Sequence, residues 1–351
     1  MLCAMHETSA LPLPPFVALS QLIRGAFTTQ LVGVAAKLGI ADLLKDGPRS
    51  SDDLAVAAGA DALALHRVLR GLVVHGVLAE VEGGRFALTP VGELLRSDAP
   101  VSLLDFALGT HGITLRTLDS LLDAVKKGGV PFEHAFGMSM FEHLMSNPEI
   151  GAVFDRFMTS MTLMVARAVT TLHDFSSYRR LIDVGGGRGQ FLAAILGANA
   201  GLEGVLLDMP PVLPRAEAYL ESAGVRARCS LEGGDFFEAV PSGGDAYLLS
   251  WILHDWDDAR CARLLANCHR AMAGQGKLIV VEQLLPDRVE DNPGAIIGDL
   301  EMLMFLPGRE RKLSEYRSLL EEQGFAITRV VPVPSPFGGT LRSIIEAAPR
   351  T

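Results

Sequence analysis

From Arg180 onward, the chain alternates short runs of β-branched and aliphatic residues with stretches of helical apolar spacing. The runs begin with LIDV and GVLLD and continue through AYLLSWIL and KLIVVEQ. Strands that alternate with helices form a mainly parallel sheet covered by helices on both faces. The last two runs, FAITRVVPV and LRSIIEAA, are joined by the short segment PSPFGG, which leaves no room for a helix. We therefore predict an α/β fold with a Rossmann-like parallel sheet and an antiparallel pairing of the last strands at its edge.

A glycine-rich turn follows the first of these strands. From Asp183 to Gly189 it has the spacing Asp-x-Gly-x-Gly-x-Gly, whereas the dinucleotide form Gly-x-Gly-x-x-Gly would need glycine in place of Gln190. Such a turn lets the backbone approach a ligand closely at the carboxyl edge of the sheet. The carboxylate of Asp183 would repel a pyrophosphate but suits a ligand with an ammonium and a sulfonium. The turn therefore favours S-adenosylmethionine over NAD.

Two more acids follow strand-like runs. Asp208 ends GVLLD, where a carboxylate can accept hydrogen bonds from both ribose hydroxyls of either cofactor, although it could also be a helix N-cap. Asp235 lies at the tip of a third strand, where its carboxylate can meet an adenine amino group and Phe236 can cover the ring. Three acids on successive strand ends predict a nucleoside-binding edge.

The fourth strand leads into a segment in which His254 stands among acids and the two tryptophans of the chain. A phenol has a pKa of about 10, so a base with a pKa of about 6.5 can take its proton as a methyl group arrives. Glu282 ends the fifth strand, and Glu310 lies on a later loop. Either carboxylate can orient an imidazole and stabilise its cation. For Glu310, a surface ion pair with a neighbouring arginine is the alternative.

The first hundred residues show the succession of elements of a winged helix. Helical spacing over residues 16–46 is followed by two helices with N-caps at Ser50 and Asp61, and then by two short strands around Gly83-Gly84. Alone, this pattern would suggest a DNA-binding regulator. Residues 35–96, however, carry seven basic and eight acidic groups, whereas phosphate binding needs a basic stripe. A module for packing or dimer formation, with no nucleic-acid partner, is favoured.

The composition excludes several classes of protein. The 351 residues include 31 basic and 41 acidic ones, a net charge of −10 that argues against a nucleic-acid-coating protein. A hydrophobic share of 49% argues against disorder. The sequence shows neither the apolar run of roughly 18–20 residues that a bilayer span needs nor a secretion signal at its start. Cys261 and Cys268 fit buried apolar positions on one helix face better than a redox pair. We expect a cytoplasmic protein without a membrane partner or a metal site.

Two regions carry more apolar residues than one helix face needs. Residues 103–172 are helical and rich in Met and Phe, which is typical of a core and also of a pocket for a flat apolar ligand. The chain before residue 35 has apolar side chains at helix-compatible spacings, and such a surplus marks an interface. These side chains are Phe16, Leu19, Leu22, Ile23, Phe27, Leu31 and Val34. We predict a twofold-symmetric homodimer formed mainly through the segment before residue 105.

The chain resembles the caffeate-type family of S-adenosylmethionine-dependent small-molecule O-methyltransferases of plants and bacterial secondary metabolism. The resemblance rests on DVGGGRG, LLDMP, GGDFF, LHDWDD, VVEQLLP and GRERK, in that order, and extends from about residue 16. It implies a winged-helix-like dimerisation domain at 1–105, connecting helices that line the acceptor pocket at 106–172, and a methyltransferase domain at 173–351. It further implies a homodimer that methylates a hydroxyl of a small aromatic molecule, leaves S-adenosylhomocysteine and needs no metal.

The same resemblance assigns individual residues. His254 matches the family's general base, and Glu282 and Glu310 match the acids that flank it. The implied cofactor contacts are Asp183, Gly185, Gly187, Asp208, Met209, Asp235, Phe236, Ser250 and Trp256. The implied substrate contacts are Phe154, Met158, Trp251, Asp255, Asp299 and Met302. Two positions depart from the pattern: Ser250 replaces a lysine of many members, and Leu118 replaces a tryptophan frequent in bacterial relatives, which could enlarge the acceptor pocket.

Two alternative functions use parts of this pattern. Some relatives use the same scaffold and cofactor for hydroxylation, decarboxylation or pericyclic steps, and the retention of His254 with Glu282 and Glu310 argues against that chemistry. A winged-helix transcriptional regulator is less favoured because of its charge balance. The sequence leaves the acceptor open among phenazines, polyketides and other phenolic secondary metabolites.

Overall fold

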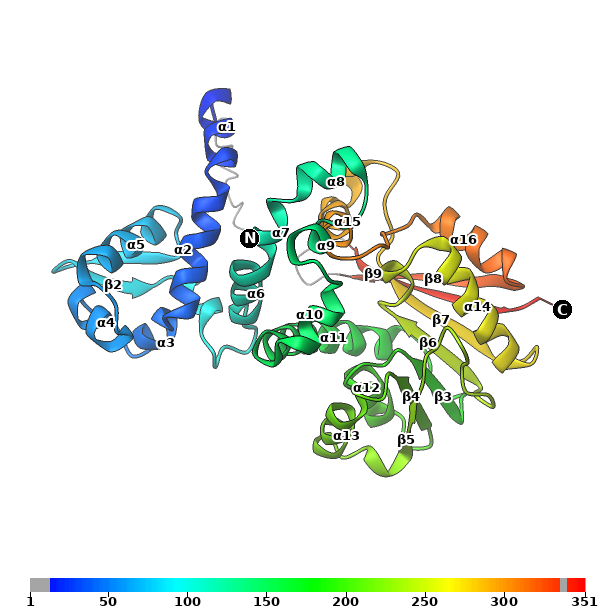
Figure 1. Ribbon diagram of the computed structural model, residues 1–351. Coiled ribbons are helices and arrows are strands. Elements are labelled where there is room, and N and C mark those ends of the chain that lie inside the picture. Colours follow the sequence, from blue (N-terminus) through cyan, green and yellow to red (C-terminus); the bar gives the residue numbers. More distant parts are fainter. Residues whose placement is uncertain (1–12, 335–339, 351) are drawn as a thin grey trace, which may run out of the picture. The chain divides into compact units, whose positions relative to one another are not determined.

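The computed structural model describes residues 13–334 and 340–350, and it divides into two compact units, one up to Leu115 and one from Arg116 (Figure 1). The first unit extends past the expected boundary at residue 105. The reason is helix α6 (Leu104–Gly109), which packs against α2 (Gly25–Lys37) of the same unit.

The first unit is mainly helical. The apolar stretch 16–46 forms α1 (Pro15–Ile23), α2 and α3 (Ile40–Leu44), and Gly39, with φ +63°, separates the last two. Helix α4 (Ser51–Ala58) and helix α5 (Ala62–Val74) begin at the predicted caps: the side chains of Ser50 and Asp61 accept hydrogen bonds from the backbone N–H groups of Asp53 and Ala64. The remaining elements are the antiparallel hairpin of β1 (Leu78–Val81) and β2 (Arg85–Leu88), η1 (Gly92–Leu95), α6 and the π-helical turn η2 (Thr110–Thr114).

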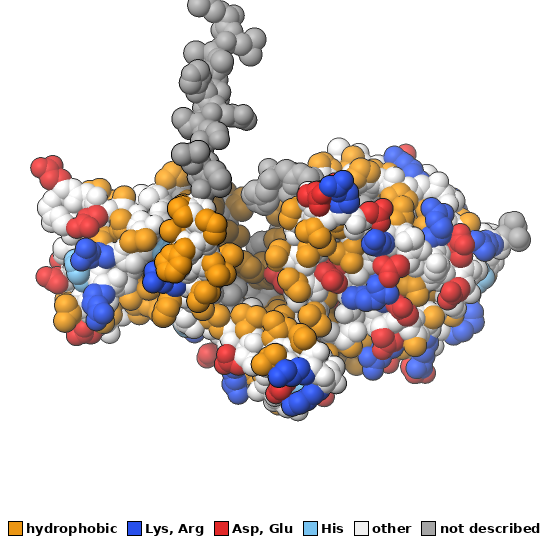
Figure 2. Space-filling view, turned by 90° about the horizontal axis from the view of Figure 1, so that it is seen from above, with side chains coloured by type: hydrophobic (Ala, Val, Ile, Leu, Met, Phe, Trp, Pro, Cys, Tyr) orange, Lys and Arg blue, Asp and Glu red, His pale blue; other side chains and the backbone are white. Residues whose placement is uncertain are grey.

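Helix α1 and the start of α2 expose large apolar side chains, a set that we call the α1–α2 apolar face. Figure 2 shows hydrophobic side chains gathered over this part of the first unit. Its members and their exposed fractions are Phe16 83%, Leu19 60%, Leu22 78%, Ile23 72% and Phe27 71%. Leu31 and Val34, which we grouped with them, are half-buried within the unit. The apolar surplus that the sequence indicates is therefore real, and α1 supplies most of it.

The second unit is built on a seven-stranded sheet in the order β5-β4-β3-β6-β7-β9-β8. Its strands are β3 (Arg180–Val184), β4 (Glu203–Asp208), β5 (Cys229–Gly233), β6 (Ala246–Ser250), β7 (Lys277–Glu282), β8 (Phe325–Pro334) and β9 (Thr340–Pro349). The first five run parallel, while β9 pairs antiparallel with both β7 and β8. The predicted fold class and the antiparallel end of the sheet are confirmed.

Helices cover both faces of this sheet (Figure 1). One apolar core joins the sheet to α11 (Pro148–Leu172), α12 (Gln190–Ala198) and α13 (Leu213–Ser222). The other joins it to α14 (Asp258–Met272) and α16 (Leu313–Glu322), and it contains both Cys261 and Cys268 as buried side chains. The apolar assignment of these two cysteines is confirmed. Cys3 lies outside the described residues.

Further helices precede or interrupt this alternation. They are α7 (Leu115–Leu118), α8 (Leu121–Lys127), α9 (Pro131–Phe136), α10 (Met140–Ser146) and α15 (Pro293–Phe305). Helix α15 packs against α9, so the Met/Phe-rich region meets the insertion between β7 and α16. Within the described residues, no helix is both long and apolar enough to cross a membrane.

Candidate active site

The topology of the sheet brings the predicted site residues to one edge. The chain winds from β3 to β4 and β5 in one direction, and β6 and β7 then lie on the other side of β3. In sheets of this kind, ligands bind beyond the carboxyl ends of the strands where the winding reverses. That point lies between β3 and β6, between the glycine-rich turn and the segment with His254.

The glycine-rich turn is tightly packed against both neighbours of β3. Gly185 and Gly187 have φ of +74° and +56°, a region that favours glycine. A Cβ on Gly185 would stand 2.5 Å from Ile252 Cδ1 and 3.4 Å from the ring of Phe236. The Gly187 N–H donates to Asp208 Oδ2 at 2.8 Å, so the ends of β3 and β4 are hydrogen-bonded to each other. The turn thus brings backbone to the place where a ligand would lie.

The two acids at this edge form a negatively charged cradle. Asp183 is 2% exposed, and its Oδ2 has no hydrogen-bond partner among the residues that the structure describes. Burial and the nearby Asp208 raise the pKa of Asp183 to about 7. Burial also raises the pKa of Asp208, while N–H bonds from Gly187 and Met209 oppose that rise. A cationic ligand would relieve both buried carboxylates, whereas a pyrophosphate would add charge of the same sign. The residues present therefore fit S-adenosylmethionine.

The other predicted cofactor residues lie on the same edge. Asp235 follows β5 and accepts a hydrogen bond from the Phe237 N–H at 2.8 Å. The rings of Phe236 and Trp256 meet edge to face at 6.2 Å, and the buried indole Nε1 of Trp256 has no partner within residues 13–334 and 340–350. Ser250 ends β6 and is half-buried, and the Met209 side chain is 53% exposed beyond β4. Their contacts with the cofactor remain predictions.

Three predicted catalytic residues converge in the interior. His254 Nδ1 lies 3.0 Å from Glu310 Oε1 and 3.7 Å from Glu282 Oε2. His254 Nε2 lies 3.3 Å from Asp255 Oδ1. His254 is 6% exposed, Glu282 0% and Glu310 1%, so the alternative interpretation of Glu310 as a surface ion pair is wrong. Residues that are 56 positions apart in sequence, His254 and Glu310, thus share a hydrogen bond.

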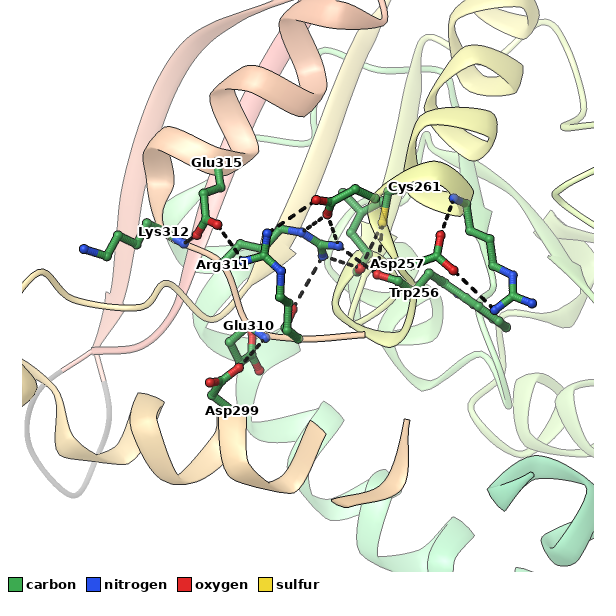
Figure 3. Close-up of polar contacts among 12 residues, drawn as sticks. Trp256, Asp257, Cys261, Asp299, Glu310, Arg311, Lys312 and Glu315 are labelled. Carbon is green, nitrogen blue, oxygen red and sulfur yellow. Dashed lines mark hydrogen bonds and ion pairs between the residues drawn. The ribbon is translucent and has the colours of Figure 1, made fainter. Parts of the chain in front are cut away.

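Backbone and side-chain contacts fix the two glutamates. Glu282 Oε1 accepts the N–H groups of Ile252 and Leu253 at 3.0 and 2.9 Å, which ties β7 to the start of the His254 segment. The Glu310 N–H donates to Asp299 Oδ1 at 2.9 Å (Figure 3). Asp299, predicted as a substrate contact, is thus placed beside the cluster, where it also holds the loop that carries Glu310.

The surrounding carboxylates control the charge of the imidazole. Burial lowers the pKa of His254, but the negative groups around it, led by Glu282 and Asp255, outweigh burial and raise the pKa to about 9. Burial raises the pKa of Asp255 to about 7, against the pull of the neighbouring imidazole. In the free protein the cluster therefore stabilises the imidazolium, the form that a general base reaches after it has accepted a proton.

Sequence reasoning missed the residues that hold the His254 segment from behind. Arg311 is fully buried and donates to the Leu253 and Trp256 carbonyls at 2.7 and 2.8 Å, and it pairs with Asp258 at 2.7 Å. The Cys261 Sγ also donates to the Leu253 carbonyl at 3.1 Å. Figure 3 shows Arg311 reaching from the loop before α16 to the segment with Trp256. The motif GRERK contained a signal, since an arginine next to a buried acid needs its own partners.

The predicted acceptor-pocket residues lie on several elements. Phe154 and Met158 are one turn apart on α11, and Met302 is on α15; all three are half-buried. Trp251 follows β6 and packs on the core beneath α11. Leu118 ends α7 and is 43% exposed. That these side chains contact an acceptor remains a prediction.

The cluster also has the donor atoms of a cation site. His254, Glu282 and Glu310 each offer a ligand atom, and these atoms lie within 4.8 Å of one another. One Glu282 oxygen is already occupied by two backbone N–H groups, and the His254 Nδ1 is hydrogen-bonded to Glu310. These bonds suit a histidine oriented by carboxylates, and removal of metal, described below, separates the two roles experimentally.

The fold and this site define the class of the protein: it is an S-adenosylmethionine-dependent methyltransferase. Residues 118–326 match the family model of the O-methyltransferase domain, and residues 20–98 match that of the O-methyltransferase dimerisation domain. The chain belongs to this O-methyltransferase family, as its six sequence segments indicate.

Relatives and solved structures agree with this assignment. The chain is 42% identical over 98% of both lengths to phenazine O-methyltransferase PhzM of Lysobacter antibioticus. It is 40% identical to O-demethylpuromycin-O-methyltransferase of Streptomyces alboniger, over 93% of this chain and 88% of the relative. The structure of mitomycin 7-O-methyltransferase MmcR matches with TM-score 0.90 and 33% identity over 95% and 97% of the two chains. That of NcsB1 with S-adenosylmethionine and 2-hydroxy-5-methyl naphthoic acid matches with TM-score 0.83 and 30% identity, over 97% and 100%.

Replacing Asp208 tests the cofactor edge. We expect Asp208→Ala to weaken the binding of S-adenosylhomocysteine by roughly 2–3 kcal/mol, because acceptors for two ribose hydroxyls are lost. Isothermal titration calorimetry measures this loss. Glu203→Ala, at the exposed opposite end of β4, is the control and should bind like the parent. Equal affinity of the Asp208 variant and the parent would refute the ribose contact.

Replacing Gly308 tests how tightly the catalytic segment is packed. A Cβ at this position would overlap backbone atoms of His254, Asp255 and Trp256. We expect Gly308→Ala to lower turnover by about tenfold or more, because a displacement of the imidazole by a fraction of an ångström disrupts its alignment. Gly294→Ala, where a Cβ would have its nearest neighbour at 3.5 Å, is the control for kinetic measurements. Unchanged turnover in the Gly308 variant would show that the His254 segment can move to accommodate the Cβ without loss of activity.

Proposed function

We propose that this enzyme transfers a methyl group from S-adenosylmethionine to a hydroxyl of an aromatic secondary metabolite, with His254 as the general base. The observation that carries the proposal is the buried imidazole held at 3.0 Å by Glu310 beside Glu282. A hydroxyl must lose its proton during methylation, and a base oriented by carboxylates serves that need.

Two groups of residues have separate roles, one in binding the cofactor and the other in removing the proton of the acceptor. Asp183, Asp208 and the glycine-rich turn bind and orient the cofactor, which supplies an activated methyl group when bound. Glu310 and Glu282 lie on the Nδ1 side of His254, so Nε2, which has Asp255 Oδ1 at 3.3 Å, is the nitrogen that would receive the proton of the acceptor. The carboxylates then stabilise the imidazolium. Holding the acceptor oxygen in line with the methyl group of the cofactor would supply much of the acceleration.

The names of the relatives support a phenolic acceptor, and one of them points to N-methylation as the alternative reaction. Relatives include a phenazine O-methyltransferase, but also phenazine-1-carboxylate N-methyltransferase of Pseudomonas aeruginosa, which is 37% identical over 90% of this chain. An aromatic amine attacks through its lone pair and does not need its proton removed first. The buried base therefore favours a hydroxyl over an amine.

Activity on a panel of metabolites tests this function. The purified chain is incubated with S-adenosylmethionine and with matched phenols and anilines of the phenazine, quinone and polyketide classes. Mass spectrometry should detect products that have gained one CH2 unit on oxygen. Methylation of the anilines alone would replace the proposal with N-methylation. Hydroxylated or decarboxylated products would favour the alternative chemistry of the same scaffold.

Treatment with a chelator tests whether the reaction needs a metal. We expect EDTA to leave the rate unchanged, because the hydrogen bonds within the cluster suit base catalysis. The measurement compares initial rates before and after dialysis against EDTA. Loss of activity that Mg²⁺ restores would assign His254, Glu282 and Glu310 to a metal site.

A homodimer is the second part of the proposal. The match to a dimerisation domain and the α1–α2 apolar face support it. Exposed apolar area of this kind is stabilised when it is covered by a second copy, and most soluble oligomers are twofold-symmetric.

A further inference from the structure

A tryptophan and an arginine stack beside the catalytic cluster. The guanidinium carbon of Arg342 lies 4.6 Å from the centre of the Trp251 ring. Trp251 follows β6 in the segment that leads to His254, and Arg342 precedes Ser343, which pairs with Glu282 across β9 and β7. The stacked pair therefore stands at the carboxyl edge of the sheet, next to the residues of the proposed reaction.

Among the described residues, the hydrogen bonds of the Arg342 guanidinium all come from Nη1. Its Nη1 donates to Gln283 Oε1 at 2.6 Å and to the Leu341 carbonyl at 2.9 Å. Its Nε is buried without a hydrogen-bond partner, and no residue in 13–334 or 340–350 accepts a bond from Nη2 or forms an ion pair with the group. The Nε–Nη2 edge is the one that binds a carboxylate through two parallel hydrogen bonds. Among the described residues, that edge of Arg342 has no hydrogen-bond acceptor.

Trp251 adds a second unpaired donor. Its indole Nε1 is buried and has no hydrogen-bond partner in the described part of the chain. Its backbone has φ +59°, a conformation that is unfavourable for a bulky residue and that concentrates at functional sites. Two N–H donors of stacked side chains, one just after β6 and one on β9, thus lack acceptors among the described residues. Buried donors of this kind usually have partners, so an acceptor that the described residues do not supply is expected here.

We propose that Arg342 and Trp251 bind a carboxylate of the acceptor, which makes the substrate a hydroxylated aromatic carboxylic acid. This inference rests on the proposed function and narrows its substrate class. The Nε–Nη2 edge would take the two carboxylate oxygens, and the indole N–H would donate to one of them. Gln283 is the positioning residue, since its bond to Nη1 sets the orientation of the guanidinium.

The acids around Arg342 do not take this role. Glu282 Oε1 and Glu310 Oε1 are bonded to backbone N–H groups and to His254, and the two Oε2 atoms have no hydrogen-bond partner among the described residues. Within those residues, none of Glu282, Glu301 and Glu310 forms an ion pair with Arg342. Their negative charge favours a cation at this place without filling its hydrogen bonds. A buried cation is stabilised when its own donors are paired, and a ligand carboxylate provides that pairing.

Gln283, which accepts a hydrogen bond from Arg342, is itself closely packed against a neighbouring helix. A Cβ on Gly298 of α15 would stand 2.7 Å from Gln283 Oε1, the atom that accepts from Arg342. Helix α15 therefore packs directly on the amide that orients the arginine. Within residues 13–334 and 340–350, the Nε–Nη2 edge has no acceptor, while Nη1 is held by Gln283 and the Leu341 carbonyl.

Two ligands that differ only in a carboxyl group test the proposal. The probes are 3-hydroxy-2-naphthoate and 2-naphthol, titrated by calorimetry into the full chain with S-adenosylhomocysteine bound. The parent should prefer the acid, and Arg342→Gln should weaken binding of the acid by about 10- to 100-fold while leaving 2-naphthol unchanged. Arg342→Lys keeps the charge but loses the planar edge, so its affinity for the acid should lie between those of the parent and Arg342→Gln. Arg260→Gln, which removes the arginine stacked at 5.4 Å on the other tryptophan, is the control and should behave like the parent.

The possible outcomes separate this proposal from the proposed function. Equal losses for both probes would make Arg342 a counter-charge of the buried glutamates and overturn carboxylate recognition. If the Arg342 variants no longer bind S-adenosylhomocysteine, the test uses Trp251→Phe, which keeps an aromatic ring, although a smaller one, and removes the N–H donor. Trp251→Phe should weaken the binding of 3-hydroxy-2-naphthoate and leave the binding of 2-naphthol unchanged. An affinity for the acid equal to that of the parent would overturn the carboxylate site. If the parent methylates 2-naphthol but does not prefer the acid, the proposed function stands and carboxylate recognition is overturned. If the acid binds in an Arg342-dependent way but no phenol is methylated, the proposed function is overturned.

Discussion

His254→Ala is expected to lower turnover by about 10²–10⁴-fold while the affinity for the cofactor stays the same, because the imidazole removes the acceptor's proton. Steady-state kinetics and calorimetry with S-adenosylhomocysteine measure the two quantities separately. The exposed His134 of the same unit offers the matched control, and His134→Ala should act like the parent. A loss that appears wholly in cofactor binding would show that His254 does not act on the acceptor.

The pH dependence should change together with the rate. The neighbouring carboxylates raise the pKa of His254 to about 9, so the free enzyme holds a protonated imidazole at neutral pH. For the parent, kcat/KM should rise with pH until the imidazole is neutral. In His254→Ala that dependence should disappear, and the remaining rate should follow ionisation of the phenol at about pH 10. An identical profile for parent and variant would assign the titration to another group.

A charge placed on the α1–α2 apolar face is expected to convert the dimer to monomers. Leu22 and Phe27 are 78% and 71% exposed, so Leu22→Glu with Phe27→Glu should not disturb the fold of one copy. Burying unpaired carboxylates in a twofold interface costs about 4 kcal/mol or more, which is about a thousandfold in the dissociation constant. Light scattering over a range of concentrations measures the mass.

The matched control for the dimer lies elsewhere in the first unit. Val56 on α4 is 86% exposed but stands outside the α1–α2 apolar face, so Val56→Glu should leave the mass unchanged. A parent that is monomeric at micromolar concentration would refute the dimer. A double variant that stays dimeric would place the interface on another surface.

Local sequence determined much of the fold because the relevant interactions are short in range. Ser50 and Asp61 cap their helices through atoms three residues away, and the connection PSPFGG is too short for anything but an antiparallel return. The strand ends likewise identified Asp183 and Asp208, since parallel strands present their carboxyl ends at one edge. The glycine spacing and the charge of Asp183 then favoured S-adenosylmethionine over NAD.

Only the tertiary structure decided which groups become buried partners. Glu310 could equally have been a surface ion pair, and its burial against His254 depends on the return of the chain after α15. The same return places Arg311 behind the His254 segment. Arg342 gave no sequence signal, because its unpaired edge arises when β9 inserts between β7 and β8 and sets the guanidinium against Trp251. Burial and long-range pairing are properties of the packed chain, and they fix the pKa values and free hydrogen-bonding groups on which its chemistry depends.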